Sequence, residues 1–82
     1  MPNDVSPPLH LRRIERSLNM RRFYTLTLQP TLFGEMSLTR HWGRIGTQGR
    51  SMTETFADEC AARHALERLT RIKRGRGYID TV

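Results

Sequence analysis

The segment from residue 42 to residue 50, WGRIGTQGR, holds the residue types best suited to a partner that carries both rings and negative charge. It contains the only tryptophan of the chain, two arginines and three of the six glycines, and it has no acidic residue. A tryptophan ring can stack on a base or a sugar, and a guanidinium can grip a phosphate through two parallel hydrogen bonds. Nucleic acid fits this combination better than a small metabolite does.

The residues next to Trp42 strengthen this interpretation. Arg40 and Arg44 flank the tryptophan at two-residue steps, and no acid occurs between Glu35 and Glu54. The ring of Trp42 can be either an exposed stacking surface or part of the core. The core alternative stays open because a tryptophan in a small domain is more often buried than exposed. His41 has a similar alternative, since a histidine on a strand packs against its neighbours more often than it binds phosphate. The candidate nucleic-acid-binding residues here are Trp42, Gly43, Arg44, Arg40, Arg50 and His41.

A second basic cluster runs from Arg68 to Arg76, and we include Arg71 and Arg74 among the candidate residues that hold phosphate. The alternative is that these charges only complement the negative end of a helix, which is worth about 0.3 to 1 kcal/mol per charge. The whole chain has a net charge of +6 and thirteen arginines against a single lysine. This bias favours a phosphate-rich partner, although a GC-rich genome produces the same bias.

Catalysis finds little support in the sequence, and we do not expect an enzyme. The three histidines are scattered, none has a carboxylate at a spacing that would orient its ring, and no serine elbow is present. Cys60 is the only cysteine, so we expect no disulfide, no cysteine-based zinc site and a small buried side chain at that position. We expect no cofactor, no metal, no membrane contact and a cytoplasmic location, because the chain has neither an apolar leader nor a spanning segment.

The pattern of apolar residues predicts one small domain. Residues 1–8 contain three of the four prolines and are expected to form a flexible tail, residues 9–79 form the domain, and residues 80–82 close the chain. Alternation with a period of two predicts strands over 22–29, 35–45 and 50–56, with an edge strand over 9–14. Residues 46–49 are expected to form a hairpin turn. Leu32 and Phe33, in the loop between the strands over 22–29 and 35–45, are expected to cap the core.

From Asp58 onward the period changes to that of a helix. Ala62, Ala65, Leu66, Leu69 and Ile72 recur at steps of three and four residues. Asp58 can cap the start of this helix, and Gly75 and Gly77 end it. Tyr78 and Ile79 either add a short strand or pack against the core. The expected fold is therefore α+β, an antiparallel sheet with one long helix packed on a face.

These residues resemble the WGR domain, a module named after the triplet that Trp42, Gly43 and Arg44 form here. The run RFYTLTLQPTLFGEMSLTRHWGRIGTQGR is similar to the stand-alone bacterial form of the family, and FADECAARHALERL and RGRGY fit its last elements. The resemblance covers about residues 9 to 79. It implies an antiparallel sheet with one helix, a nucleic-acid-binding role, and a tryptophan that packs against the end of a DNA strand. The signature arginine of the polymerases in this family also links DNA to neighbouring domains, and we expect only the binding role to carry over to Arg44.

We interpret the chain as a module that binds nucleic acid, with DNA as the expected partner and with little dependence on base sequence; the sequence does not distinguish DNA from RNA. The other interpretation is an adaptor whose tryptophan and arginine hairpin recognises an acidic protein partner, because the same residue types form hot spots between proteins. The sequence does not discriminate duplex from strand end, and it does not indicate an oligomeric state.

Overall fold

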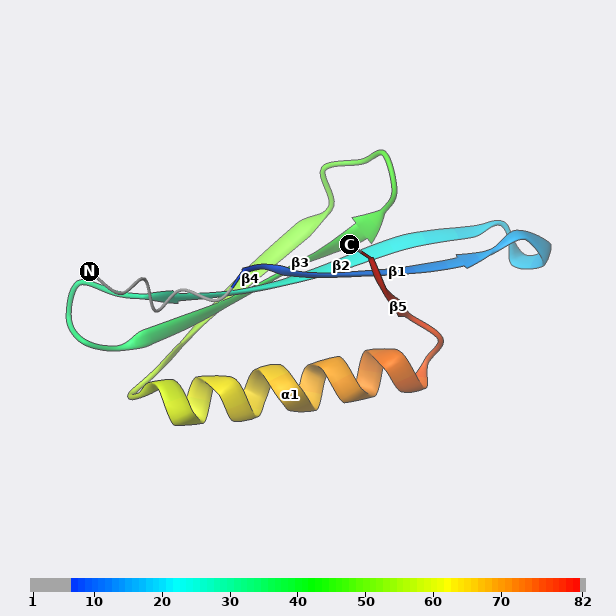
Figure 1. The fold of residues 1–82 in the computed structure, drawn as a ribbon. Coiled ribbons are helices and arrows are strands. Elements are labelled where there is room, and N and C mark those ends of the chain that lie inside the picture. The colour runs from blue at the N-terminus through cyan, green and yellow to red at the C-terminus, as the bar shows by residue number, and fades with distance from the viewer. Residues whose placement is uncertain (1–6, 82) are drawn as a thin grey trace.

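The computed structural model describes residues 7–81, and their strands form one antiparallel sheet in the order β4-β3-β2-β1-β5. A single long helix, α1, packs against one face of this sheet (Figure 1). The elements are β1 (Leu9–Glu15), a short 3-10 helix η1 (Arg16–Leu18), β2 (Met20–Pro30), β3 (Met36–Arg44), β4 (Arg50–Phe56), α1 (Glu59–Gly75) and β5 (Ile79–Thr81). The expected α+β fold is confirmed.

The alternation of apolar and polar side chains gives the sheet two different faces. Tyr24, Leu26 and Leu28 of β2 are buried beneath α1, whereas the residues between them point to the opposite side. We call the side that α1 covers the helix face and the opposite side the open face. The core lies between the helix face and α1, and its buried residues are Leu11, Tyr24, Leu26, Leu28, Met36, Leu38, Ala62 and Tyr78.

Helix α1 begins and ends where the sequence predicts. The Asp58 carboxylate accepts a hydrogen bond from the backbone N–H of Ala61 at 2.8 Å, which satisfies one of the unpaired donors of the first turn. Ala62 is fully buried against the sheet, and Leu66 and Leu69 pack beside it. After the last turn, Gly77 takes φ +98°, a left-handed conformation that favours glycine, and this lets Tyr78 return to the core.

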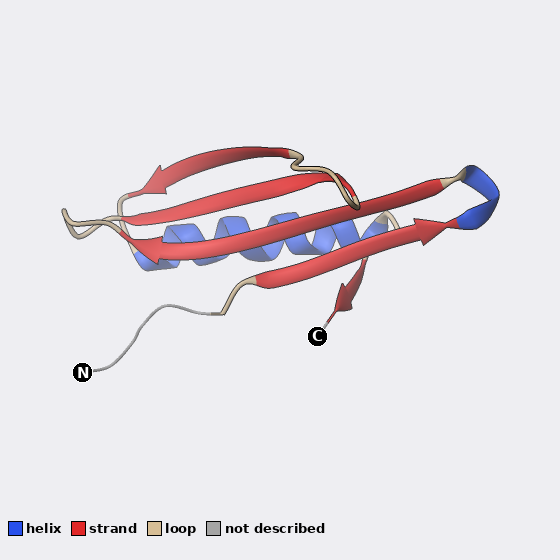
Figure 2. Cartoon of the chain, turned by 90° about the horizontal axis from the view of Figure 1, so that it is seen from above, coloured by secondary structure: helices blue, strands red, loops and turns tan. Residues whose placement is uncertain are grey.

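The β1–β2 hairpin extends beyond the C-terminal end of α1 (Figures 1 and 2). Its strands pair without interruption from Leu9 opposite Leu26 to Glu15 opposite Met20. Asn19 closes the turn at φ 52°, a conformation that asparagine tolerates better than most residues. Because α1 ends first, the part of the helix face near this hairpin is left open to solvent.

Two expectations about the ends of the sheet are wrong. Strand β1 is not an edge strand, because β5 pairs with its outer side over three residues. Leu32 and Phe33 do not cap the core, since they are 97% and 86% exposed. The hydroxyl oxygen of Thr31 accepts hydrogen bonds from the backbone N–H groups of Phe33 and Glu35, both at 3.2 Å, and this folds the loop back on itself beyond the sheet.

Cys60 is also not the buried side chain that the sequence suggested, because it is exposed. It lies two positions before Ala62, so the helical turn carries it about 200° away from the buried stripe. The predicted flexible tail falls mostly on residues 1–6, which lie outside the described residues. In the part of the chain that the structure describes, no helix has the length and apolar character needed to cross a membrane.

Candidate nucleic-acid interface

Strand β3 places three of the candidate residues on the helix face. Because side chains alternate along a strand, Arg40, Trp42 and Arg44 all point to the side of α1. The register then adds one arginine on each side: Arg50 of β4 lies opposite Trp42, and Arg22 of β2 lies opposite Arg44. Four of the predicted site residues are thus brought together with a fourth cation, Arg22, which is not among the candidates predicted from the sequence.

Trp42 is half-buried, between the two positions that the sequence left open. Its ring packs against Tyr24, the residue opposite it on β2, with ring centres 6.3 Å apart and planes tilted by 36°. The guanidinium carbon of Arg40 lies 6.0 Å from the centre of the Trp42 ring, close enough for a cation–π contact. One side of the ring therefore belongs to the core, and the remaining surface is accessible.

Lys73, at the end of α1, brings further positive charge to the same place. Its ammonium lies 4.5 Å from the centre of the Tyr24 ring and 5.4 Å from that of Tyr78. Partial burial lowers the pKa of Lys73, and the charges of Arg76, Arg22 and Arg40 lower it further. Three arginines, from β2, β3 and the end of α1, are therefore close enough to act on the Lys73 ammonium.

No carboxylate within residues 7–81 forms an ion pair with this group. The ion pairs between described residues are Arg63 with Glu59 and Arg74 with Asp80. Close by, the buried Nε–H of Arg13, which packs near Gly77, has no acceptor. Neighbouring carboxylates of the described residues therefore do not neutralise these cations through ion pairs.

We call this region the Trp42 surface. It consists of aromatic rings partly covered by the end of α1 and of cations from β2, β3, β4 and α1, namely Trp42, Tyr24, Tyr78, Arg22, Arg40, Arg44, Arg50, Lys73 and Arg76. The candidate list lacks Arg22, Lys73 and Arg76. The RGRGY segment could have indicated Lys73 and Arg76, because glycines that end a helix let the chain turn back to the sheet, and the cations before Tyr78 then lie near it.

Gly43 and His41 lie on the open face, away from the Trp42 surface, and they shape the β3–β4 hairpin. A Cβ at Gly43 would lie 2.7 Å from the Cα of Gly49, so glycine allows the two strands to approach closely. The Nε2–H of His41 donates to the carbonyl oxygen of Gln48 at 2.5 Å, and its ring meets the edge of Phe23 with centres 5.1 Å apart. Neither residue shares a face with Trp42.

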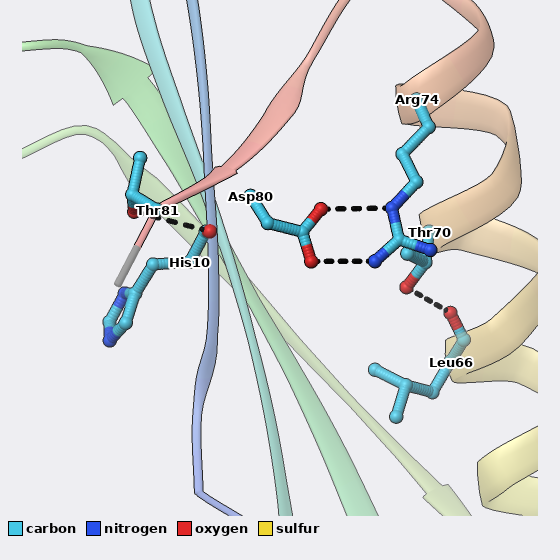
Figure 3. A network of polar contacts seen from close by, with 6 residues as sticks. All are labelled: His10, Leu66, Thr70, Arg74, Asp80 and Thr81. Atoms are coloured by element: carbon cyan, nitrogen blue, oxygen red, sulfur yellow. Dashed lines mark hydrogen bonds and ion pairs between the residues drawn. The ribbon is translucent and has the colours of Figure 1, made fainter.

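Arg71 and Arg74 are not brought to Trp42 either. Successive helix residues are rotated by about 100°, so Arg71, nine residues after the buried Ala62, lies on the outer side of α1, whereas Lys73 reaches Tyr24 of β2. Arg74 donates two hydrogen bonds to the Asp80 carboxylate, at 2.9 and 2.6 Å, and this contact lowers the pKa of Asp80 (Figure 3). Arg71 lines one hollow with Leu9 and another with Phe56. The basic cluster of α1 is therefore split between two sides of the helix.

The Arg44 guanidinium also has a local partner. Its Nη1–H donates to the carbonyl oxygen of Asn19 at 3.2 Å, which ties β3 to the turn of the β1–β2 hairpin. The remaining donors of this exposed side chain are available to a ligand. Among residues 7–81, no three His, Cys, Asp or Glu side chains gather into a group that could hold a metal ion.

The fold and the Trp42 surface define a small α+β domain with one aromatic, strongly basic region. The chain belongs to the WGR domain family, whose family model matches residues 8–82. It is similar to the uncharacterized protein y4dW of Sinorhizobium fredii, with 44% identity over 76 residues that cover 90% of this chain and 37% of the relative. The chain thus spans well under half the length of that relative. No solved structure matches it.

Proposed function

We propose that this chain binds DNA through the Trp42 surface, by contacts to phosphates and to one exposed base or sugar, with little dependence on base sequence. The observation that carries the proposal is the group of cations around Lys73 and Trp42, which forms no ion pair with a carboxylate within residues 7–81. A phosphate placed there would gain attraction from several cations at once. Trp42, half-exposed beside Arg40, offers a stacking surface at the same place.

The predicted lack of sequence dependence follows from the elements that carry the cations. Arg22, Arg40 and Arg44 stand on sheet strands, and Lys73 and Arg76 lie at the end of a helix that is packed on the sheet. None of these elements is a helix free to enter a major groove, where base pairs are distinguished. We propose a binding module, in which these residues position the phosphate backbone and do not catalyse a reaction.

The test is a fluorescence-anisotropy titration of two short blunt duplexes of different sequence over a series of salt concentrations. If three to five phosphates are neutralised, log affinity falls with log salt at a slope of about −3 to −4.5. Both duplexes should bind alike, and a preference above about 3 kcal/mol would contradict the proposal. A slope near zero would also contradict it.

A matched pair of variants locates the binding. Lys73→Met and Arg68→Met each remove one positive charge from α1, but only Lys73 belongs to the Trp42 surface. We expect Lys73→Met to weaken DNA binding and to reduce the salt slope by about one, while Arg68→Met changes little. Equal effects of the two variants would mean that only the net charge matters. Binding to poly-glutamate as strong as to DNA, with the same dependence on Lys73, would favour the acidic-protein partner instead.

A further inference from the structure

The open face of the sheet carries no carboxylate among the described residues. Three strand residues are acidic, and the register places each of them on the helix face: Glu15 lies opposite Met20, Glu54 opposite Leu38, and Asp80 opposite Leu11. The open face instead presents mostly hydroxyl groups together with histidines, arginines and one aromatic ring. This separation of charge has no role in packing, because α1 does not cover the open face (Figures 1 and 2).

Two neighbouring rows of side chains run across this face. The register sets Thr81, His10, Thr25, His41 and Ser51 in one row, with one residue from each strand. It sets Ile79, Arg12, Phe23 and Gly43 in the next row. A ring, a guanidinium and two imidazoles are therefore side by side near the middle of the sheet.

These rows surround an open hollow of about 430 Å³, whose lining includes His10, Arg12, Phe23, Thr25, His41 and Thr81. Its polar groups are held in place by hydrogen bonds. The Nδ1 atom of His10 is hydrogen-bonded to the Thr25 hydroxyl at 3.2 Å, and the Thr81 hydroxyl donates to the His10 carbonyl oxygen at 3.2 Å (Figure 3). A volume of this size suits one nucleotide-sized ligand.

The ring of Phe23 is fixed as well. Its edge contact with His41 holds it on one side, and the glycine backbone of the β3–β4 hairpin lies against it on another, since a Cβ at Gly49 would be 2.8 Å from its Cζ atom. A ring that is already immobilised loses little side-chain entropy when a flat ligand stacks on it.

We propose that the open face binds a single strand of nucleic acid, with one unpaired base stacked on Phe23 and the adjoining phosphate held by Arg12. The described residues place no carboxylate on this face, which suits a polyanion, and the hydroxyls of Thr25 and Thr81 offer hydrogen bonds to base edges. A base inside a duplex is stacked on both sides, so only an unpaired strand presents its flat surface to the ring. This site shares no residue with the Trp42 surface, and it does not rest on the function proposed there.

The probe is a fluorescein-labelled oligothymidylate of about ten nucleotides, within the usual range of single-strand sites. Arg12→Gln removes a charge from the hollow, and Arg68→Gln removes one from the outside of α1 as a matched control. We expect Arg12→Gln to weaken binding of the oligonucleotide at least three-fold more than Arg68→Gln. Equal losses would overturn the proposal.

Phe23→Leu tests the stacking while it keeps an apolar side chain against Gly49. We expect a loss of roughly five-fold or more in affinity for the oligonucleotide, the lower end of what one stacked base contributes. Circular dichroism checks that this variant is folded, and the exposed Arg12 supplies an independent test if it is not. Unchanged affinity of a folded Phe23→Leu protein would overturn the stacking.

Two further arms separate this site from the Trp42 surface and from a protein partner. Lys73→Met should leave oligothymidylate binding unchanged, and an excess of unlabelled blunt duplex should not displace the oligonucleotide. If Lys73→Met weakened the affinity for the oligonucleotide and Arg12→Gln did not, the single strand would bind at the Trp42 surface, and the proposal would be overturned. Poly-glutamate that binds as tightly, with the same dependence on Arg12 and Phe23, would overturn it in favour of an acidic protein.

Discussion

Truncating Trp42 separates its contribution to the core from its contribution to binding. Replacing a buried aromatic residue by alanine costs about 3 to 5 kcal/mol of unfolding free energy, and roughly half of that is expected for a half-buried ring. We therefore expect Trp42→Ala to lose about 2 kcal/mol. A domain of this size has a total stability of about 4 to 12 kcal/mol, so the variant should stay folded with a Tm lowered by about 8 to 16 °C.

The same substitution should weaken DNA binding by about 1 to 3 kcal/mol, which is roughly five- to 150-fold, because it removes one stacking surface. Phe56→Ala is the matched control. Phe56 is also an aromatic residue packed at the margin of the core, but it lies on β4 near the start of α1, away from Lys73. We expect a similar loss of stability from Phe56→Ala and no loss of affinity, with both variants measured at a temperature at which they are folded.

Fluorescence gives an independent reading, because Trp42 is the only tryptophan. In the free protein we expect partial quenching by acrylamide, as its half-buried ring implies, and additional quenching when DNA binds. The reasoning would be refuted if DNA left the emission unchanged and Trp42→Ala lost no more affinity than Phe56→Ala. Trp42 would then be a core residue only, and the binding site would have to be sought elsewhere.

Three other predictions follow from single contacts. Gly43→Ala should destabilise the protein by about 1 to 3 kcal/mol, because the added Cβ would meet the Gly49 backbone. Gly75→Ala has open space around the added Cβ, so it should be neutral or stabilise the protein by up to about 1 kcal/mol. Denaturant unfolding measures both variants, and equal effects would refute the steric argument. Arg44→Lys should weaken DNA binding nearly as much as Arg44→Ala, since lysine keeps the charge but lacks the planar fork, and parent-like affinity would reduce Arg44 to diffuse charge. Because Arg74 lowers the pKa of Asp80, this pair stabilises the fold at pH values above the ordinary aspartate pKa of about 3.9, and the stabilisation is lost as the pH falls through the lowered pKa. The Tm of the parent should therefore exceed that of Asp80→Asn near neutral pH, and the difference should vanish in acid. A Tm difference that persists in acid would refute this account.

The fold could be predicted well because local patterns and tertiary packing agree in this chain. Thr25, Leu26 and their neighbours alternate with a period of two, and the helix stripe from Ala62 to Leu69 has the helical period. One error concerns apolar residues that lie outside any periodic segment. Leu32 and Phe33 are apolar residues in a loop, and the hydrogen bonds of Thr31 turn them outward instead of inward.

The candidate site could be predicted only in part, for a physical reason. Alternation along one strand is readable, so Arg40, Trp42 and Arg44 could be grouped from the sequence. The register between strands is not readable in this way, and neither is the side of α1 that meets β2. The sequence therefore groups Lys73 with the other cations at the end of the helix, although its ammonium lies over the rings of Tyr24 and Tyr78.

The three residues that name the family perform different physical tasks, and the alternation of β3 explains why they must be consecutive. Trp42 and Arg44 share the helix face, where one packs on Tyr24 and the other reaches the turn at Asn19. Gly43 stands between them on the open face, where the Gly49 backbone leaves no room for a side chain. That close approach pairs Trp42 with Arg50 in the last rung between β3 and β4. A side chain at Gly43 should therefore disturb the Trp42 surface from the opposite face of the sheet, without contact to any ligand.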